Sequence, residues 1–140
     1  MEARKNETAG LNAKRYTKEE WLEEFENMLR YAMPDGMNEL ALAVYSSSSM
    51  LGFWDNPRNV GEMFFLTVCE LAEAYERFRK QRHNEPDDHV SDHPNMAVEL
   101  GDAIIRLLDI AHGMGYDIGQ AIADKMLYNI NRPYMHGKVS

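Results

Sequence analysis

Cysteine is almost absent from this chain of 140 residues, since Cys69 is the only one. An intramolecular disulfide is therefore impossible, and a reducing, cytoplasmic compartment is the natural expectation. Long apolar runs are also missing, because no stretch approaches about 18 consecutive apolar residues, so we expect no transmembrane span. The N-terminal charges are not followed by an apolar run, and we expect no secretory signal.

The chain has fewer basic residues than acidic ones. The chain has 15 Lys and Arg against 23 Asp and Glu, which gives a formal net charge of −8. This balance argues against nucleic acid or an anionic membrane as the main partner, although metal ions can still bridge an acidic protein to a polyphosphate. The chain also lacks a glycine-rich phosphate loop, an H-E-x-x-H zinc pattern and a convincing Ser-His-Asp arrangement.

The composition that remains is that of a globular protein, with 44% hydrophobic and 27% charged residues. The length favours one domain, which we place at residues 17–134 between a polar N-terminal arm (1–16) and a basic-tipped tail (135–140). A chain this short often gains stability by forming oligomers.

Helical periodicity and helix-end signals run through the domain. Thr17 and Glu20 fit a capping box for a first helix, which should end at the Pro-Asp-Gly turn signal within 33–36. Further helices are expected at about 38–51, 57–82, 95–112 and 117–131. No strong strand pattern is present, so the sequence predicts an all-α bundle of four to five helices.

The main chemical signal is a pair of acidic stripes on two apolar helices. Glu70 and Glu73 are three residues apart, as are Glu99 and Asp102, so each pair shares one helix face. A helix that is apolar almost all round is normally buried, and its carboxylates then need a wet pocket or a partner. Facing pairs would gather four like charges, which a hard divalent cation with oxygen ligands would relieve. The alternative is two solvated faces paired with Arg or Lys.

A second signal is a polar set near the last helix: Lys125, Asn129, Arg132 and Tyr134. The first three follow at one-turn spacing, and cations with an amide on one face suit phosphate oxygens. The alternative is ordinary basic residues near a helix C-terminus, where the helix dipole favours them.

Several other residues could have either a functional or a packing role. Trp54 lies in a connection, where it could stack on a base or pack as a core residue. Serines in the run 46–49 can bond back to the preceding turn, or allow close approach of a neighbour or ligand. Asp109 could support the acidic cluster, or Arg106 could neutralise part of it. We read His112 and Cys69 as packing residues.

Taken together, three blocks resemble the MazG-like superfamily of all-α NTP pyrophosphohydrolases, in its small stand-alone members. They are the paired motif E-x-x-E with E-x-x-D, the aromatic turn Gly-Phe-Trp-Asp at 52–55, and the ending from Lys125 to Lys138. The resemblance covers about residues 39–138. Some relatives carry an extra Glu where this chain has Cys69, which leaves the number of metal ions open.

The resemblance implies a Mg²⁺-dependent nucleotide pyrophosphohydrolase, with Mn²⁺ as a substitute, that converts an NTP or dNTP to the monophosphate and pyrophosphate. It assigns metal binding to the carboxylates Glu70, Glu73, Glu99 and Asp102. We take Glu73 as the group that accepts the proton of the attacking water. The resemblance assigns phosphate contacts to Lys125, Asn129 and Arg132, phosphate or ribose to Tyr134, and the base to Trp54. It also implies a homodimer or homotetramer with the bundle core shared between chains.

Two other hypotheses stay open at this point. The substrate could be another pyrophosphate compound, such as phosphoribosyl-ATP or an alarmone, because base and sugar contacts lie in variable loops. The chain could also be a non-enzymatic helical regulator that binds nucleotide or metal without turnover. A di-iron bundle needs E-x-x-H on two helices, which this sequence lacks.

Overall fold

The structure, a computed structural model, describes residues 17–132, and every regular element in that range is helical. The elements are α1 (Lys18–Asn27), the π-helix η1 (Met28–Ala32), α2 (Met33–Met50), α3 (Val60–Arg79), α4 (Asn95–Gly113) and α5 (Ile118–Ile130). This confirms the all-α prediction. Within the described range, no helix has both the length and the apolar character needed to cross a membrane.

The predicted capping box opens α1. The Thr17 hydroxyl accepts the Glu20 N–H at 3.2 Å, and the Glu20 carboxylate accepts the Thr17 N–H at 2.9 Å. Each bond satisfies a backbone donor that has no partner within the helix. The local sequence therefore fixes where the first helix begins.

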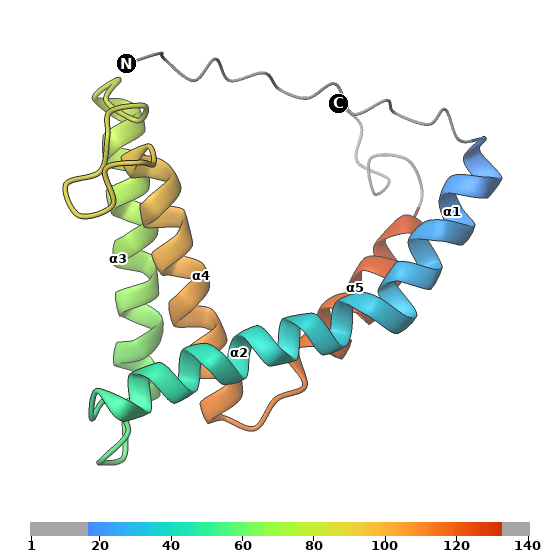
Figure 1. The fold of residues 1–140 in the computed structure, drawn as a ribbon, viewed down its shortest axis with the longest axis horizontal. Coiled ribbons are helices and arrows are strands. Elements are labelled where there is room, and N and C mark those ends of the chain that lie inside the picture. Colours follow the sequence, from blue (N-terminus) through green and yellow to red (C-terminus); the bar gives the residue numbers. More distant parts are fainter. Residues whose placement is uncertain (1–16, 133–140) are drawn as a thin grey trace, which may run out of the picture.

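The predicted turn at 33–36 is wrong, because the chain continues from α1 through η1 into α2 (Figure 1). The Met33 N–H donates to the carbonyl of Met28, five residues back, which is the π-type bond. Pro34 then falls in the first turn of α2, where its missing N–H costs little. The wider π turn thus lets proline and Gly36 lie inside a helical path.

The other helix ends lie close to prediction. Helix α3 begins at Val60, slightly later than expected, because the Asn59 side chain caps it by accepting the Glu62 N–H at 3.2 Å. It ends before Gln81, whose φ of 58° lies in the left-handed region. Asp117 caps α5 as predicted, with its carboxylate accepting the Gln120 N–H at 2.9 Å.

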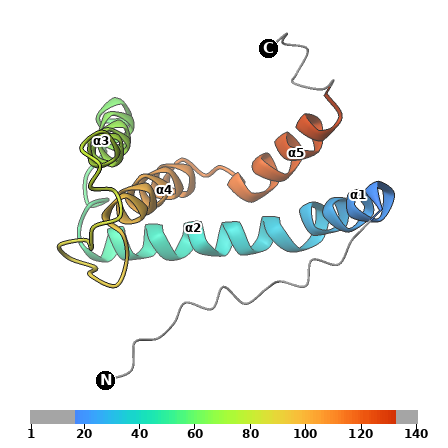
Figure 2. The ribbon, with the colours of Figure 1, turned by 90° about the horizontal axis from the view of Figure 1, so that it is seen from above.

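The helices form two arms joined by α2 (Figures 1 and 2). Helices α3 and α4 pack side by side and α4 crosses one end of α2, whereas α5 runs along the other end of α2 and η1. The buried apolar side chains are mostly small, which allows close helix approach: Leu29, Ala41, Met63, Ala74, Ala103, Leu108, Ile110, Ala111 and Ala123.

The prediction that α3 and α4 are buried holds only in part for a single chain, because each helix buries one side and exposes apolar residues elsewhere. Large apolar side chains on both helices are exposed, and Phe65 keeps 66% of its surface and Ile104 keeps 54%. Other exposed apolar side chains on these two helices are Phe64, Val68, Leu71, Tyr75, Phe78, Leu100, Ile105 and Leu107. One chain therefore leaves a large apolar face uncovered on its α3–α4 arm.

Candidate metal centre

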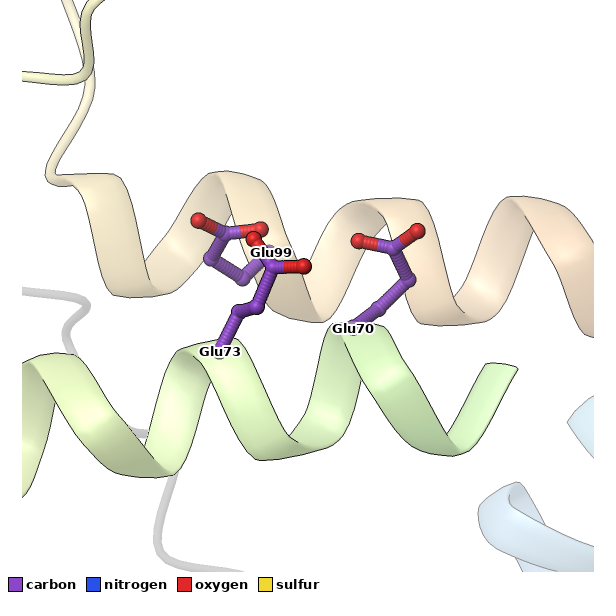
Figure 3. A group of neighbouring side chains, drawn as sticks. All are labelled: Glu70, Glu73 and Glu99. Atoms are coloured by element: carbon purple, nitrogen blue, oxygen red, sulfur yellow. The ribbon is translucent and has the colours of Figure 1, made fainter. Parts of the chain in front are cut away.

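Three of the predicted carboxylates meet between α3 and α4. Glu70 and Glu73 project from successive turns of α3, and Glu99 projects from the facing turn of α4 (Figure 3). One oxygen from each lies within 4.8 Å of one from each of the others. We call Glu70, Glu73 and Glu99 the carboxylate group. The three-residue spacing creates it on α3, and the packing of the two helices completes it.

Asp102 is not part of this carboxylate group, although the sequence predicted four members. It lies one turn beyond Glu99 on α4 and lines a neighbouring pocket instead. The structure therefore brings together three of the four predicted carboxylates, with the fourth at the edge of the site.

The carboxylate group is electrostatically strained. Glu99 is 8% exposed, and burial followed by the charges of Glu73 and Glu70 raises the pKa of its carboxyl above the ordinary value. Arg77 opposes this shift. Several oxygen donors around a small volume with excess negative charge suit a hard divalent cation such as Mg²⁺ or Mn²⁺. The donor set thus fits a cation of this class.

Two arginines flank the group. Arg106 on α4 donates from Nε to Glu70 Oε1 at 2.7 Å, and Arg77 Nε lies 4.0 Å from Glu99 Oε1. The sequence indicated that Arg106 could neutralise part of the cluster, and the structure confirms this pairing. The sequence did not single out Arg77. The available signal was its position four residues after Glu73, on the same face of α3.

The Asp109 carboxylate interacts with hydrogen-bond donors from separate parts of the chain. One oxygen accepts the Ser48 hydroxyl and, at 2.9 Å, the Trp54 indole N–H, while Arg58 lies 3.5 Å from the other oxygen. We call Asp109, Ser48, Trp54 and Arg58 the Asp109 network. The sequence did not single out Ser48 or Arg58, and only the serine run offered a signal for the first.

Trp54 is half-buried in this corner of the fold. Its ring lies 5.1 Å from that of Tyr45, and a Cβ added to Gly113 would overlap it. Its N–H is already used by Asp109. These contacts are those of a packing residue, and the role of Trp54 in base binding stays a prediction.

A pocket of about 710 Å³ lies between α2, α3 and α4 beside the carboxylate group. Its apolar wall comes from Ala43, Val44, Leu51, Phe53, Leu66 and Ile105. Its charged lining comes from Arg58, Asp102, Arg106 and Asp109. Clefts of several hundred Å³ with apolar walls and a few charged groups are typical of small-molecule sites.

The predicted phosphate contacts lie elsewhere in the chain. Lys125 and Arg132 lie over the Tyr128 ring, at 4.6 and 5.9 Å from its centroid. They belong to α5 or follow it directly, as does Asn129, and α5 packs on the arm opposite α3 (Figure 1). One chain therefore does not bring them to the carboxylate group. Tyr134 lies outside the described residues.

Comparisons with models of known protein families, with curated proteins and with solved structures find no match to this chain.

Proposed function

We propose that this protein is a Mg²⁺-dependent nucleotide pyrophosphohydrolase that cleaves an NTP or dNTP to the monophosphate and pyrophosphate in the cytoplasm. The observation that carries the proposal is the meeting of Glu70, Glu73 and Glu99 beside a nucleotide-sized pocket. The motif resemblance to the MazG-like superfamily supports the same reaction. Metal with flanking cations is a common arrangement for phosphoryl chemistry.

The glutamates of the carboxylate group differ in exposure, and we assign their roles accordingly. Bound Mg²⁺ would supply charge neutralisation and a more acidic water. Glu70, Glu73 and Glu99 would hold the cation, with Glu99 as its buried ligand, while Asp102 lines the adjacent pocket. Glu73 is exposed and can take the proton from the attacking water. The water oxygen bonds to phosphorus as the anhydride bond breaks, and pyrophosphate leaves with that electron pair.

The phosphate contacts assigned to Lys125, Asn129 and Arg132 would come from a second copy of the chain. Lys125, Asn129 and Arg132 lie on the opposite arm from the carboxylate group within one chain. The exposed apolar face of α3 and α4 gives a second copy a surface to cover. Stable interfaces bury about 800 Å² per partner and are apolar at their centre, so the homodimer or homotetramer predicted earlier fits this face.

The test is incubation with a panel of canonical and modified NTPs and dNTPs, with Mg²⁺ or with EDTA, followed by product identification. We expect monophosphate plus pyrophosphate, and no product in EDTA. Glu73→Gln should lower kcat by about 100-fold or more, because proton transfer and cation contact are both lost. Glu76→Gln is the matched control, since Glu76 pairs with Arg79 and Lys80 on the α3 surface.

Turnover that persists in EDTA would contradict the proposal. An absence of turnover on all nucleotides would also contradict it. Phosphoribosyl-ATP and alarmones belong in the same panel, because cleavage of these alone would keep the metal chemistry but change the substrate. Binding of cation and nucleotide without any cleavage would identify a non-enzymatic regulator.

A further inference from the structure

Two guanidinium groups line the same pocket in a protein with a net charge of −8. Arg58 is held in place, since it lies 3.5 Å from Asp109 and over the rings of Phe53 and Trp54 at 5.7 and 5.6 Å. Arg106 enters the pocket from α4 beside Asp102. The apolar walls and the two cations together suit a ligand that combines a ring system with phosphate groups.

The two arginines differ in their carboxylate partners. The partner of Arg58 is Asp109, which is 7% exposed and also accepts the Ser48 and Trp54 donors. The partner of Arg106 is Glu70, a member of the carboxylate group. Arg58 is therefore fixed by the fold, whereas Arg106 depends on a carboxylate that a bound cation would also use.

Arg106 and a cation would compete for Glu70. The Arg106 guanidinium already occupies Oε1 of Glu70, and a cation bound to the same carboxylate would bring two positive charges close together, which repel. The Arg106 side chain is 39% exposed but that of Glu70 only 13%, so Arg106 can leave this partly buried pair only when the cation replaces its charge beside Glu70. Once released, the guanidinium remains in the pocket that it already lines.

We propose that the pocket between α2, α3 and α4 binds the nucleotide, and that Arg106 transfers from Glu70 to a phosphate of this ligand when a divalent cation occupies the carboxylate group. The inference rests on the proposed function. Arg58 is a second, fixed contact for the anionic part of the ligand. Cation and nucleotide binding are then coupled through Arg106, in addition to any direct contact between them.

The test is a pair of binding measurements on the full chain. Calorimetry gives the Kd of Mg²⁺ alone, and a second titration gives the Kd of the non-hydrolysable α,β-methylene ATP at saturating Mg²⁺. Arg106→Gln should tighten Mg²⁺ binding by about threefold or more, because Glu70 loses its competitor. The same variant should weaken analogue binding by about tenfold, because a phosphate loses its cation.

Controls separate this from a general charge effect. Arg79→Gln removes the same charge from an exposed α3 ion pair and should leave both constants within about twofold. Arg58→Gln should weaken the analogue but leave Mg²⁺ binding unchanged, because Arg58 contacts no member of the carboxylate group. Circular dichroism checks that each variant is folded.

The opposite signs of the two changes in Arg106→Gln are the diagnostic result. An unchanged or weaker Mg²⁺ affinity, or an unchanged analogue affinity, overturns the inference while the proposed function stands. A wild-type protein that binds no Mg²⁺ overturns the proposed function, and the inference with it.

Discussion

At the scale of single residues, the pKa of a carboxylate depends on the groups that face it. Glu70, Glu73 and Glu76 follow one another at the same spacing on α3. Hydrogen bonds from Arg79 and Lys80 lower the pKa of Glu76 to about 2, whereas burial and the charges of Glu73 and Glu70 raise the pKa of Glu99. The first is a solvated ion pair, and the second is a strained site that a cation would relieve.

Glu99→Gln should stabilise the metal-free protein while it weakens cation binding. The change removes one of three like charges whose oxygens lie within 4.8 Å, and keeps the shape of the side chain. The gain should be about 1 kcal/mol, since the nearby Arg77 already offsets part of the repulsion. Denaturant unfolding in EDTA measures it. A loss of stability in EDTA would show that Glu99 is a structural ion-pair partner of Arg77.

Asp117 gives the protein a pH-dependent contribution to stability. The Asn38 amide and the Gln120 N–H lower the pKa of its carboxyl below 3.8. A lowered folded pKa stabilises the fold above the unfolded value, and this contribution disappears as pH falls below 3.8 through the folded pKa. Asp117→Asn should therefore lower the Tm at pH 7, and the difference in Tm between the wild type and the variant should shrink below pH 4. A difference that is constant across this range would contradict the assignment.

At the scale of elements, the packing of α5 on α2 depends on one glycine. Gly119 is buried, its N–H donates to the Asn38 side chain at 2.9 Å, and an added Cβ would overlap the Pro34 carbonyl. Backbone atoms cannot move aside as a flexible side chain can. This contact ties the first turn of α5 to the first turn of α2.

Gly119→Ala should destabilise the protein by about 1–3 kcal/mol, because overpacking outweighs the gain in helix propensity. Gly36→Ala is the matched control. A Cβ at Gly36, which is exposed within α2, meets nothing within 4 Å and should stabilise by about 0.5–1 kcal/mol. Chemical denaturation of both variants measures the difference. Equal effects would mean that α5 does not pack on α2 through this glycine.

Local sequence signals were sufficient to predict where most helices begin, but they did not predict the π-helix η1. Thr17, Asn59 and Asp117 cap their helices with bonds that depend only on near neighbours. The π turn before Pro34 could not be predicted, because it requires the tertiary packing that keeps η1 against α5. The same limit applies to the site. Spacing predicted the pair Glu70 and Glu73, but only the register of α4 against α3 decides that Glu99 joins them and Asp102 does not.

At the scale of the whole molecule, the two arms separate the predicted functional groups. The carboxylate group lies on the α3–α4 arm, and Lys125 and Arg132 lie on the arm of α5. The sequence could not show this separation, because it depends on the direction in which α5 leaves the α4 turn. A site that uses both sets therefore requires two copies of the chain.

Mixed dimers test this arrangement. Glu73→Gln and Lys125→Ala should each abolish most activity alone, but their co-expression should restore about a quarter of it. Half of the dimers are then mixed, and each mixed dimer has one site with both groups intact. Phe65→Glu, which places a charge on the exposed α3 face, should prevent the restoration. No restoration without Phe65→Glu would mean that each site is built within one chain or does not use Lys125.

A divalent cation held by Glu70, Glu73 and Glu99 can be located directly in a crystal. Crystals grown with Mn²⁺ would show it as an anomalous difference peak. We expect a peak between α3 and α4 within about 2.0–2.3 Å of oxygens from the three glutamates, and no such peak in Glu99→Gln. A peak elsewhere, or none at saturating Mn²⁺ with Arg106 still bound to Glu70, would contradict this cation site.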